Sequence, residues 1–111
     1  MSWNTSKFHA KKTTVDGITF DSRKEADRYL TLKAMEKEGL IGNLRRQVRY
    51  ELVPAFAVDG KHYRPVFYVA DFVYVEDGKE VVEDVKGMKT DVYRLKSKLF
   101  ARRYGMGIKE T

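Results

Sequence analysis

An Asp-Gly pair at residues 77 and 78 constrains the fold of this chain more than any other short segment. The pair separates two runs rich in β-branched and aromatic residues, 68–76 and 79–86. An Asp-Gly dipeptide in this position is typical of a two-residue hairpin, because such a tight turn requires residues that tolerate positive φ. The sequence therefore predicts that the two runs pair as antiparallel strands with Asp77 and Gly78 as the loop.

A two-residue loop also predicts the register of the hairpin. It places Asp71 directly opposite Asp84, and like charges that face each other across a ladder are destabilising. Side chains alternate between faces with a period of two, so Lys86 shares the face of Asp84. A divalent cation bound between the acids is the simplest reason to tolerate this arrangement. The other expected pairs are Glu76 with Lys79, Tyr74 with Val81, and Phe72 with Glu83.

The register leaves one alternative open. Glu83 precedes Asp84 in the sequence and is expected to point to the opposite face of the sheet. If the strand bulges, or if the loop is not two residues long, Glu83 replaces Asp84 opposite Asp71 and the site must be redrawn. Gln47 is expected at the start of another strand, where it is an accessory candidate for the site or simply a structural residue.

The composition indicates one soluble, globular domain. The chain has 111 residues, of which 42% are hydrophobic and 34% charged, a length that suits one compact domain better than two. No apolar run approaches the roughly 20 residues that span a membrane, and the N-terminus has no apolar signal core. The absence of cysteine excludes disulfides, thiolate zinc sites and cysteine nucleophiles. We expect a cytoplasmic protein without membrane contact.

The charge distribution favours a polyanionic partner. The formal net charge is +6, and basic residues crowd the segment 86–103, whereas acids concentrate around 76–84. A basic surface beside an acidic cluster suits DNA held against a metal site. The expected DNA-binding residues are Lys89, Arg94, Lys96, Lys98 and Arg102, together with Lys11 and Lys12 near the N-terminus.

The first half of the chain predicts an arm, a hairpin, a helix and a second hairpin. Residues 1–12 are expected to form a basic, flexible arm, and residues 13–111 a single domain. A short hairpin is expected over 13–20, and a helix opens at Ser22 and ends near Gly39, with residues 26, 29, 30, 33 and 34 at helical spacing. Ser22 and Glu25 match a capping box, so Glu25 is interpreted equally well as a cap residue or as a third acid. Strands are expected over 47–57 and 63–68, joined at Asp59-Gly60, with Pro54 and Pro65 at strand ends.

The second half adds the central hairpin and another helix. This helix is expected to begin at Thr90 or Asp91 and to end at Gly105, with an apolar side formed by Val92, Leu95, Leu99 and Phe100. A short strand over 106–110 follows. The order of elements predicts an α+β (mixed α/β) fold, in which two helices flank a central, mostly antiparallel sheet.

The motifs of the chain resemble those of the PD-(D/E)xK nuclease superfamily. Ala70-Asp71 stands where the superfamily has Pro-Asp, and Asp84-Val85-Lys86 matches (D/E)-x-K. The segment from Ser22 to Glu25 resembles the helix-borne acid of the resolvase-like branches. More narrowly, the chain is similar over nearly its whole length to a phage and prophage family of small uncharacterised proteins, through the segments 9–13, 16–26 and 82–90.

The resemblance implies a restriction-endonuclease-like core and a magnesium-dependent chemistry. Asp71 and Asp84 would ligate Mg²⁺ or Mn²⁺ together with the Val85 carbonyl, and Glu25 would complete the cage directly or through water. Lys86 would orient or deprotonate the attacking water. Oxygen ligands of this kind are those that hard cations prefer.

The implied function is a metal-dependent DNA endonuclease of phage origin, specific for branched DNA such as a Holliday junction and therefore connected with DNA recombination. The two-fold character of a junction favours a homodimer, which would act in the cytoplasm of a bacterial host. The alternatives are a non-catalytic nucleic-acid binder on a nuclease-like fold, and a structural or anti-host interaction protein.

Overall fold

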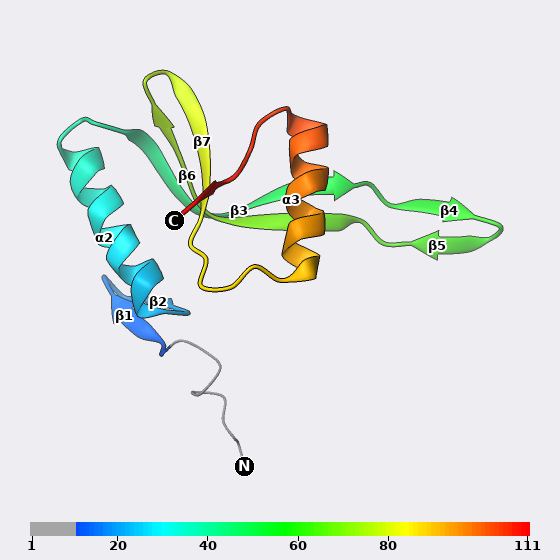
Figure 1. The fold of residues 1–111 in the computed structure, drawn as a ribbon, viewed down its shortest axis with the longest axis horizontal. Helices are drawn as coiled ribbons and strands as arrows, with labels where there is room; N and C mark the ends of the chain where they lie inside the picture. The colour runs from blue at the N-terminus through cyan, green and yellow to red at the C-terminus, as the bar shows by residue number, and fades with distance from the viewer. Residues whose placement is uncertain (1–10) are drawn as a thin grey trace, which may run out of the picture.

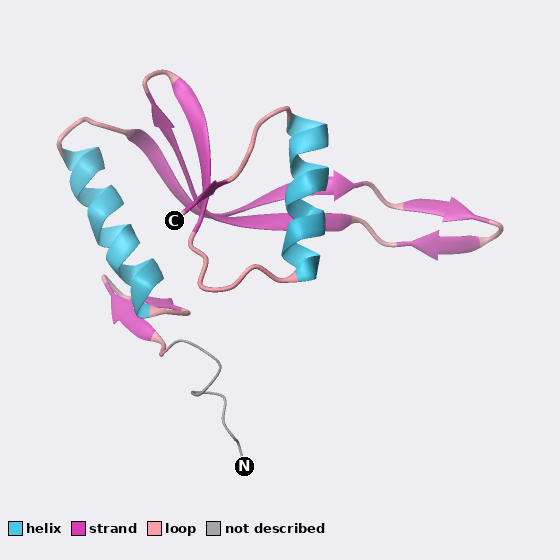
Figure 2. Cartoon of the chain, in the orientation of Figure 1, coloured by secondary structure: helices cyan, strands magenta, loops and turns pink. Residues whose placement is uncertain are grey.

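The computed structural model describes residues 11–111, so most of the expected arm over 1–12 lies outside the described residues. The fold is α+β, as predicted, and its central sheet has the strand order β3-β6-β7-β8 (Figures 1 and 2). Two small hairpins, β1-β2 and β4-β5, form separate two-stranded sheets. The elements are β1 (Thr13–Val15), β2 (Ile18–Phe20), α2 (Arg23–Lys37), β3 (Gly42–Val53), β4 (Phe56–Val58), β5 (Lys61–Tyr63), β6 (Val66–Glu76), β7 (Lys79–Asp84), α3 (Asp91–Tyr104) and β8 (Lys109–Glu110).

The hairpin β6-β7 has the predicted turn and register. Asp77 and Gly78 both have positive φ, 51° and 75°, as a type I′ turn requires. The pairs of Glu76 with Lys79, of Tyr74 with Val81 and of Phe72 with Glu83 are all present. β8 adds to β7 in parallel and covers its other edge, so the expected strand over 106–110 is confirmed in shorter form.

The two helices cover opposite faces of the β6-β7 hairpin. Phe72 and Tyr74 point into a hydrophobic cluster with α2, whereas Val73 and Val82 point into a cluster with α3. Alternation along the strands explains this division, because neighbouring side chains point to opposite faces. Each such side chain, when fully buried, contributes about 1.5–3 kcal/mol of hydrophobic free energy to folding.

The alternation of side chains between the two faces of the sheet reverses at one rung, the pair formed by Gln47 and Asp71. In β3, Leu44 packs with the α2 cluster but Val48 packs with the α3 cluster, although both positions are even-numbered. The reversal coincides with Gln47, whose φ of 53° is unusual inside a strand. Arg46 pairs with Phe72 and Val48 with Ala70, so Gln47 lies opposite Asp71. Gln47 therefore does not begin a strand, as the sequence suggested. It lies within β3, at the position where the side chains of β3 and β6 exchange faces of the sheet.

The buried faces of both helices agree with the sequence prediction at Ala26, Tyr29 and Phe100 and differ from it at other positions. In α2 the buried residues are 25, 26, 29 and 32, while Leu30 is 46% exposed. In α3 the buried residues are Tyr93 and Phe100, while Val92 and Leu95 are 64% and 57% exposed. The reason is aromatic packing: Tyr93 and Phe100 contact Tyr68 of β6, and large aromatic side chains dominate core energetics. The predicted helix ends are confirmed, with Thr90 as N-cap and Gly105 as C-cap.

Candidate active site

The reversed rung brings an aspartate next to the end of β7. Asp71 accepts hydrogen bonds from the main-chain amide of Val85, 2.8 Å from Oδ2, and from Nε2 of Gln47, 3.4 Å from Oδ1. Burial, together with the hydrogen bond and negative charge of Asp84, raises the pKa of Asp71 to about 7. The predicted proximity of Asp71 and Asp84 is therefore present, and the two carboxyl groups compete for one negative charge.

The carboxylate of Asp84 is buried and only partly satisfied. Asp84 is 2% exposed, and its Oδ2 makes no hydrogen bond. The ammonium of Lys86 lies 2.5 Å from that oxygen and forms an ion pair with it. The same ammonium lies 4.1 Å from the centre of the Tyr93 ring, a cation–π contact that stabilises its charge. Lys86 is therefore held at the site and is not a solvated lysine at a strand end.

Glu25 reaches the same site from the N-terminal turn of α2. Its amide donates to Oγ of Ser22, as expected for a helix cap, but its carboxylate lies 3.4 Å from Nε2 of Gln47 and 4.0 Å from Nη2 of Arg46. Burial, followed by the charge of Asp21, raises the pKa of Glu25, and Arg46 only partly opposes this. The amide of Glu25 therefore takes part in the helix cap, while its carboxylate lies near Gln47 and Arg46, where its role as a third acid stays a prediction.

Three buried polar atoms without a hydrogen-bond partner surround this cluster. Among residues 11–111 they are Oδ2 of Asp84, Oη of Tyr68 and Nε of Arg46. Arg46 is paired with Glu25. Burial raises the pKa of Tyr68, and the charges of Asp84, Tyr93 and Asp71 raise it further. Buried polar groups normally have hydrogen-bond partners, so the concentration of these atoms at one place makes the cluster the candidate site of the protein. Sequence reasoning did not identify Arg46 or Tyr68, because their approach to the acids depends on the reversed rung.

Glu83 is excluded from the acid cluster by its own partners. It is fully buried on the α2 face, where Arg28 donates from Nε and Nη2 at 2.6 and 2.9 Å. Tyr74 and Thr111 donate to it as well, at 2.7 and 3.0 Å. Burial alone would raise the pKa of Glu83, but the hydrogen bonds from Arg28 and Tyr74 leave it lowered. The alternative in which Glu83 replaces Asp84 is therefore wrong, because the two-residue turn keeps the register.

The described residues fit a small divalent cation with few protein ligands. No three histidine, aspartate or glutamate side chains between residues 11 and 111 are placed to hold a metal together. The adjacent carboxyl groups of Asp71 and Asp84 still match Mg²⁺, which commonly binds through one or two carboxylates and keeps water and substrate oxygens as its other ligands.

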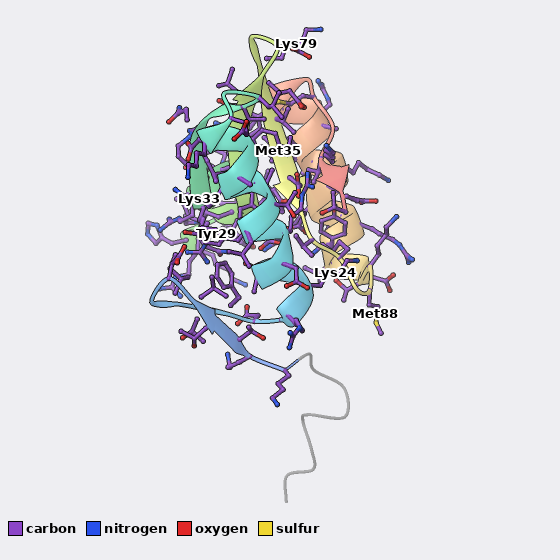
Figure 3. The ribbon with its side chains drawn as sticks, turned by 90° about the vertical axis from the view of Figure 1, so that its left-hand side faces the viewer. Lys24, Tyr29, Lys33, Met35, Lys79 and Met88 are labelled. Atoms are coloured by element: carbon purple, nitrogen blue, oxygen red, sulfur yellow. The ribbon has the colours of Figure 1, made fainter. Side chains whose placement is uncertain are left out.

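The predicted DNA-binding residues are distributed over two regions. Lys96, Lys98 and Arg102 lie on α3, Arg94 pairs there with Asp91, and Lys89 precedes the helix with its Nζ 2.7 Å from Glu110. Lys11 and Lys12 instead precede β1, where Lys12 pairs with Asp21. A cation that sequence reasoning missed is Lys24, which donates to the carbonyl of Lys86 at 2.9 Å and lies next to the loop that carries Met88 (Figure 3).

Comparison with known proteins gives one match. Residues 5–111 match the model of a family described as "Protein of unknown function (DUF1064)". No curated protein and no solved structure matches the chain. Within residues 11–111, neither helix is long and apolar enough to cross a membrane.

Proposed function

We propose that this chain, which belongs to the DUF1064 family of proteins of unknown function, is a metal-dependent DNA endonuclease. The observation that carries the proposal is the buried pair of carboxyl groups, Asp71 and Asp84, next to the ammonium of Lys86, which is ion-paired with Asp84. A fixed ammonium beside two competing carboxyl groups suits a site that binds a cation and a phosphate together. The resemblance of these residues to the PD-(D/E)xK pattern supports the same chemistry.

Asp71 and Asp84 would hold Mg²⁺ or Mn²⁺, with the Val85 carbonyl as a further oxygen and Glu25 acting directly or through water. The bound cation would lower the pKa of a water molecule and screen the negative charge of the phosphate. Gln47 donates to both Glu25 and Asp71, so it holds these two carboxylates in a common position. It is a positioning residue in the proposed site.

Lys86 supplies the fixed positive charge of the proposed mechanism. Its ammonium would orient the attacking water and stabilise the charge that develops on the phosphorane oxygens. Tyr93 limits the movement of this side chain, because its ring lies against the ammonium. The hydrogen bond from the side-chain ammonium of Lys24 to the main-chain carbonyl of Lys86 holds the backbone at the same residue.

The proposed substrate is branched DNA, recognised mainly through phosphates. The cations of α3 lie on the same side of the sheet as Asp84, since Val82 of β7 packs against this helix. Phosphate contacts position a protein without reading the sequence, which suits recognition of shape. We propose a homodimer, because a junction has two-fold character and because the exposed Val92 and Leu95 offer an apolar contact on α3. The bacterial cytoplasm would be the place of action.

The decisive experiment is cleavage of a DNA panel by the wild-type chain and by Asp84→Ala. Linear, flap, fork and four-way junction substrates are incubated with Mn²⁺ or with EDTA. The wild type should nick or cut only with the metal, and Asp84→Ala should lose at least about 10³-fold in rate while it still binds DNA. Asp27→Asn, at an exposed position of α2, is the matched control and should cut normally. Wild-type cutting by Asp84→Ala would refute the mechanism.

A non-catalytic nucleic-acid binder is the second candidate. The direct ion pair between Lys86 and Asp84 favours it, because this pair neutralises the carboxylate without any metal. Such a binder would hold DNA equally well with EDTA, would cut no substrate of the panel, and would lose affinity only as salt is raised.

A further inference from the structure

The hairpin β4-β5 forms an arm that stands apart from both helices (Figure 1). Pro54 and Pro65 interrupt the ladder at its base, because proline cannot donate a main-chain hydrogen bond. An isolated two-stranded hairpin is marginally stable in water. An arm of this kind therefore gains most when a partner covers it.

One face of the arm is apolar, aromatic and exposed. The rings of Phe56 and Tyr63 stack with centroids 4.8 Å apart, and Nζ of Lys61 lies 5.1 Å from the centre of the Tyr63 ring. Val58 pairs with Lys61 on this face. Phe56, Val58 and Tyr63 remain 47%, 51% and 40% exposed. Large apolar side chains gathered at the surface mark a site of contact.

The charges of the arm select the class of partner. Between residues 54 and 65 the arm contains two basic residues, Lys61 and Arg64, and the histidine His62. Its one acid is Asp59 at the turn. A second copy of the chain would bring another arm with the same cations, which is unfavourable for arm-to-arm contact. The major groove of duplex DNA matches both features, because its phosphates attract the cations and its thymine methyl groups offer apolar contacts to the exposed rings.

The length of the ribbon relates the arm to the acidic site. Twelve residue steps separate Gln47, beside the acids, from Asp59 at the tip. At about 3.3 Å per residue this is a reach of about 40 Å, or about twelve base pairs at 3.4 Å each. A two-stranded ribbon also has the width that the major groove of duplex DNA accepts.

From these observations we propose that the β4-β5 arm binds a groove of duplex DNA about one helical turn from the phosphodiester held at the acidic site. The inference rests on the proposed function for the position of the scissile phosphate. It adds a requirement on the substrate, namely a duplex long enough to reach the arm.

The test measures affinity as a function of duplex length. Asp84→Ala protein, in EDTA, is titrated with four-way junctions whose arms are 8 or 20 base pairs long, so that binding is read without cleavage. The long junction should bind at least about tenfold more tightly for this protein. Adding Lys61→Glu, or alternatively Phe56→Ser, should remove that advantage and leave affinity for the short junction unchanged. Lys79→Glu, at the turn of the other exposed hairpin, is the matched charge control and should keep the advantage.

The outcomes separate the two proposals. Equal affinity for both lengths, or equal losses on both, overturns the arm proposal, while metal-dependent cutting by the otherwise wild-type chain would still support the nuclease. A shift in sedimentation mass on changing Phe56 or Lys61, without loss of DNA affinity, assigns the arm to a second copy and also overturns it. Because Phe56→Ser removes a stacked ring, its thermal unfolding is compared with that of Lys61→Glu, which keeps the ring pair.

Discussion

Two adjacent carboxylates on β7 have opposite environments. Glu83 points toward α2 and receives hydrogen bonds from Arg28, Tyr74 and Thr111. Asp84 points to the other face, with one oxygen that no donor reaches in hydrogen-bond geometry. Both are nearly inaccessible to water. The difference teaches that two equally buried acids can differ in how their charge is compensated: Glu83 by several hydrogen bonds, and Asp84 by an ion pair with Lys86 beside a second carboxyl group.

The largest loss of stability should come from removing a hydrogen-bond partner of Glu83. Arg28→Ala leaves the charge of Glu83 buried without its bidentate partner, and we expect a loss of about 3–5 kcal/mol in the free energy of unfolding. Urea denaturation at neutral pH, in EDTA, measures it. Arg23→Ala, at an exposed position of the same helix, is the control and should change stability by less than about 0.5 kcal/mol. If the two variants were equally stable, the distinction between Glu83 and Asp84 would fail.

The next effect compares the two acids by matched amide substitutions. Glu83→Gln weakens several charge-assisted hydrogen bonds and should cost about 1–3 kcal/mol. Asp84→Asn removes the repulsion from Asp71 but also the ion pair with Lys86, so without metal we expect the two effects to offset each other to within about 1 kcal/mol. Thermal melts of both variants in EDTA provide the measurement. A larger loss for Asp84→Asn than for Glu83→Gln would show that Asp84 is the structural acid.

The binding of a divalent ion should depend on pH because of Asp71. Its pKa of about 7 means that a proton must leave before a cation can bind, so affinity should fall up to tenfold for each pH unit below 7 and level off above it. The sign for stability is the reverse: the folded state binds this proton more tightly than the unfolded state, so without metal stability falls as pH rises from about 4 to 7. Calorimetric titration with Mn²⁺ between pH 5.5 and 8.5 tests the first statement, and Asp71→Asn should abolish both trends.

The smallest effect concerns the cations on the two faces. Lys98→Glu on α3 should reduce the slope of log affinity for DNA against log salt by about one to two, because each phosphate contact contributes about 0.9 to that slope. Lys37→Glu, at the end of α2, should leave the slope unchanged. Fluorescence anisotropy at several salt concentrations measures both. Equal changes would mean that DNA does not prefer the α3 side.

The sequence was most informative where structure is local. The Asp77-Gly78 turn specifies its own geometry, and the register of β6-β7 follows from it, so the meeting of Asp71 with Asp84 could be predicted. The bidentate ion pair between Arg28 and Glu83 could not be predicted, since 55 residues separate the partners in the sequence.

The buried side of α3 was also beyond local reasoning. Val92 and Leu95 have helical spacing, yet the face that is buried is the one whose aromatic residues meet Tyr68. The site residues Arg46 and Tyr68 were missed for a related reason, because nothing near Gln47 in the sequence signals a left-handed residue inside a strand.

The reversed rung at Gln47 and Asp71 has a consequence for cooperativity. Because the side chains of β3 and β6 exchange faces at this rung, the same two continuous strands contribute side chains to both hydrophobic clusters. Neither half of the protein then has a sheet of its own, and we expect the two halves to unfold in one transition, with amide protons on both sides of the rung exchanging at similar rates. The acids lie where the two clusters meet on these shared strands. A ligand bound there would therefore raise the free energy of unfolding of both halves together.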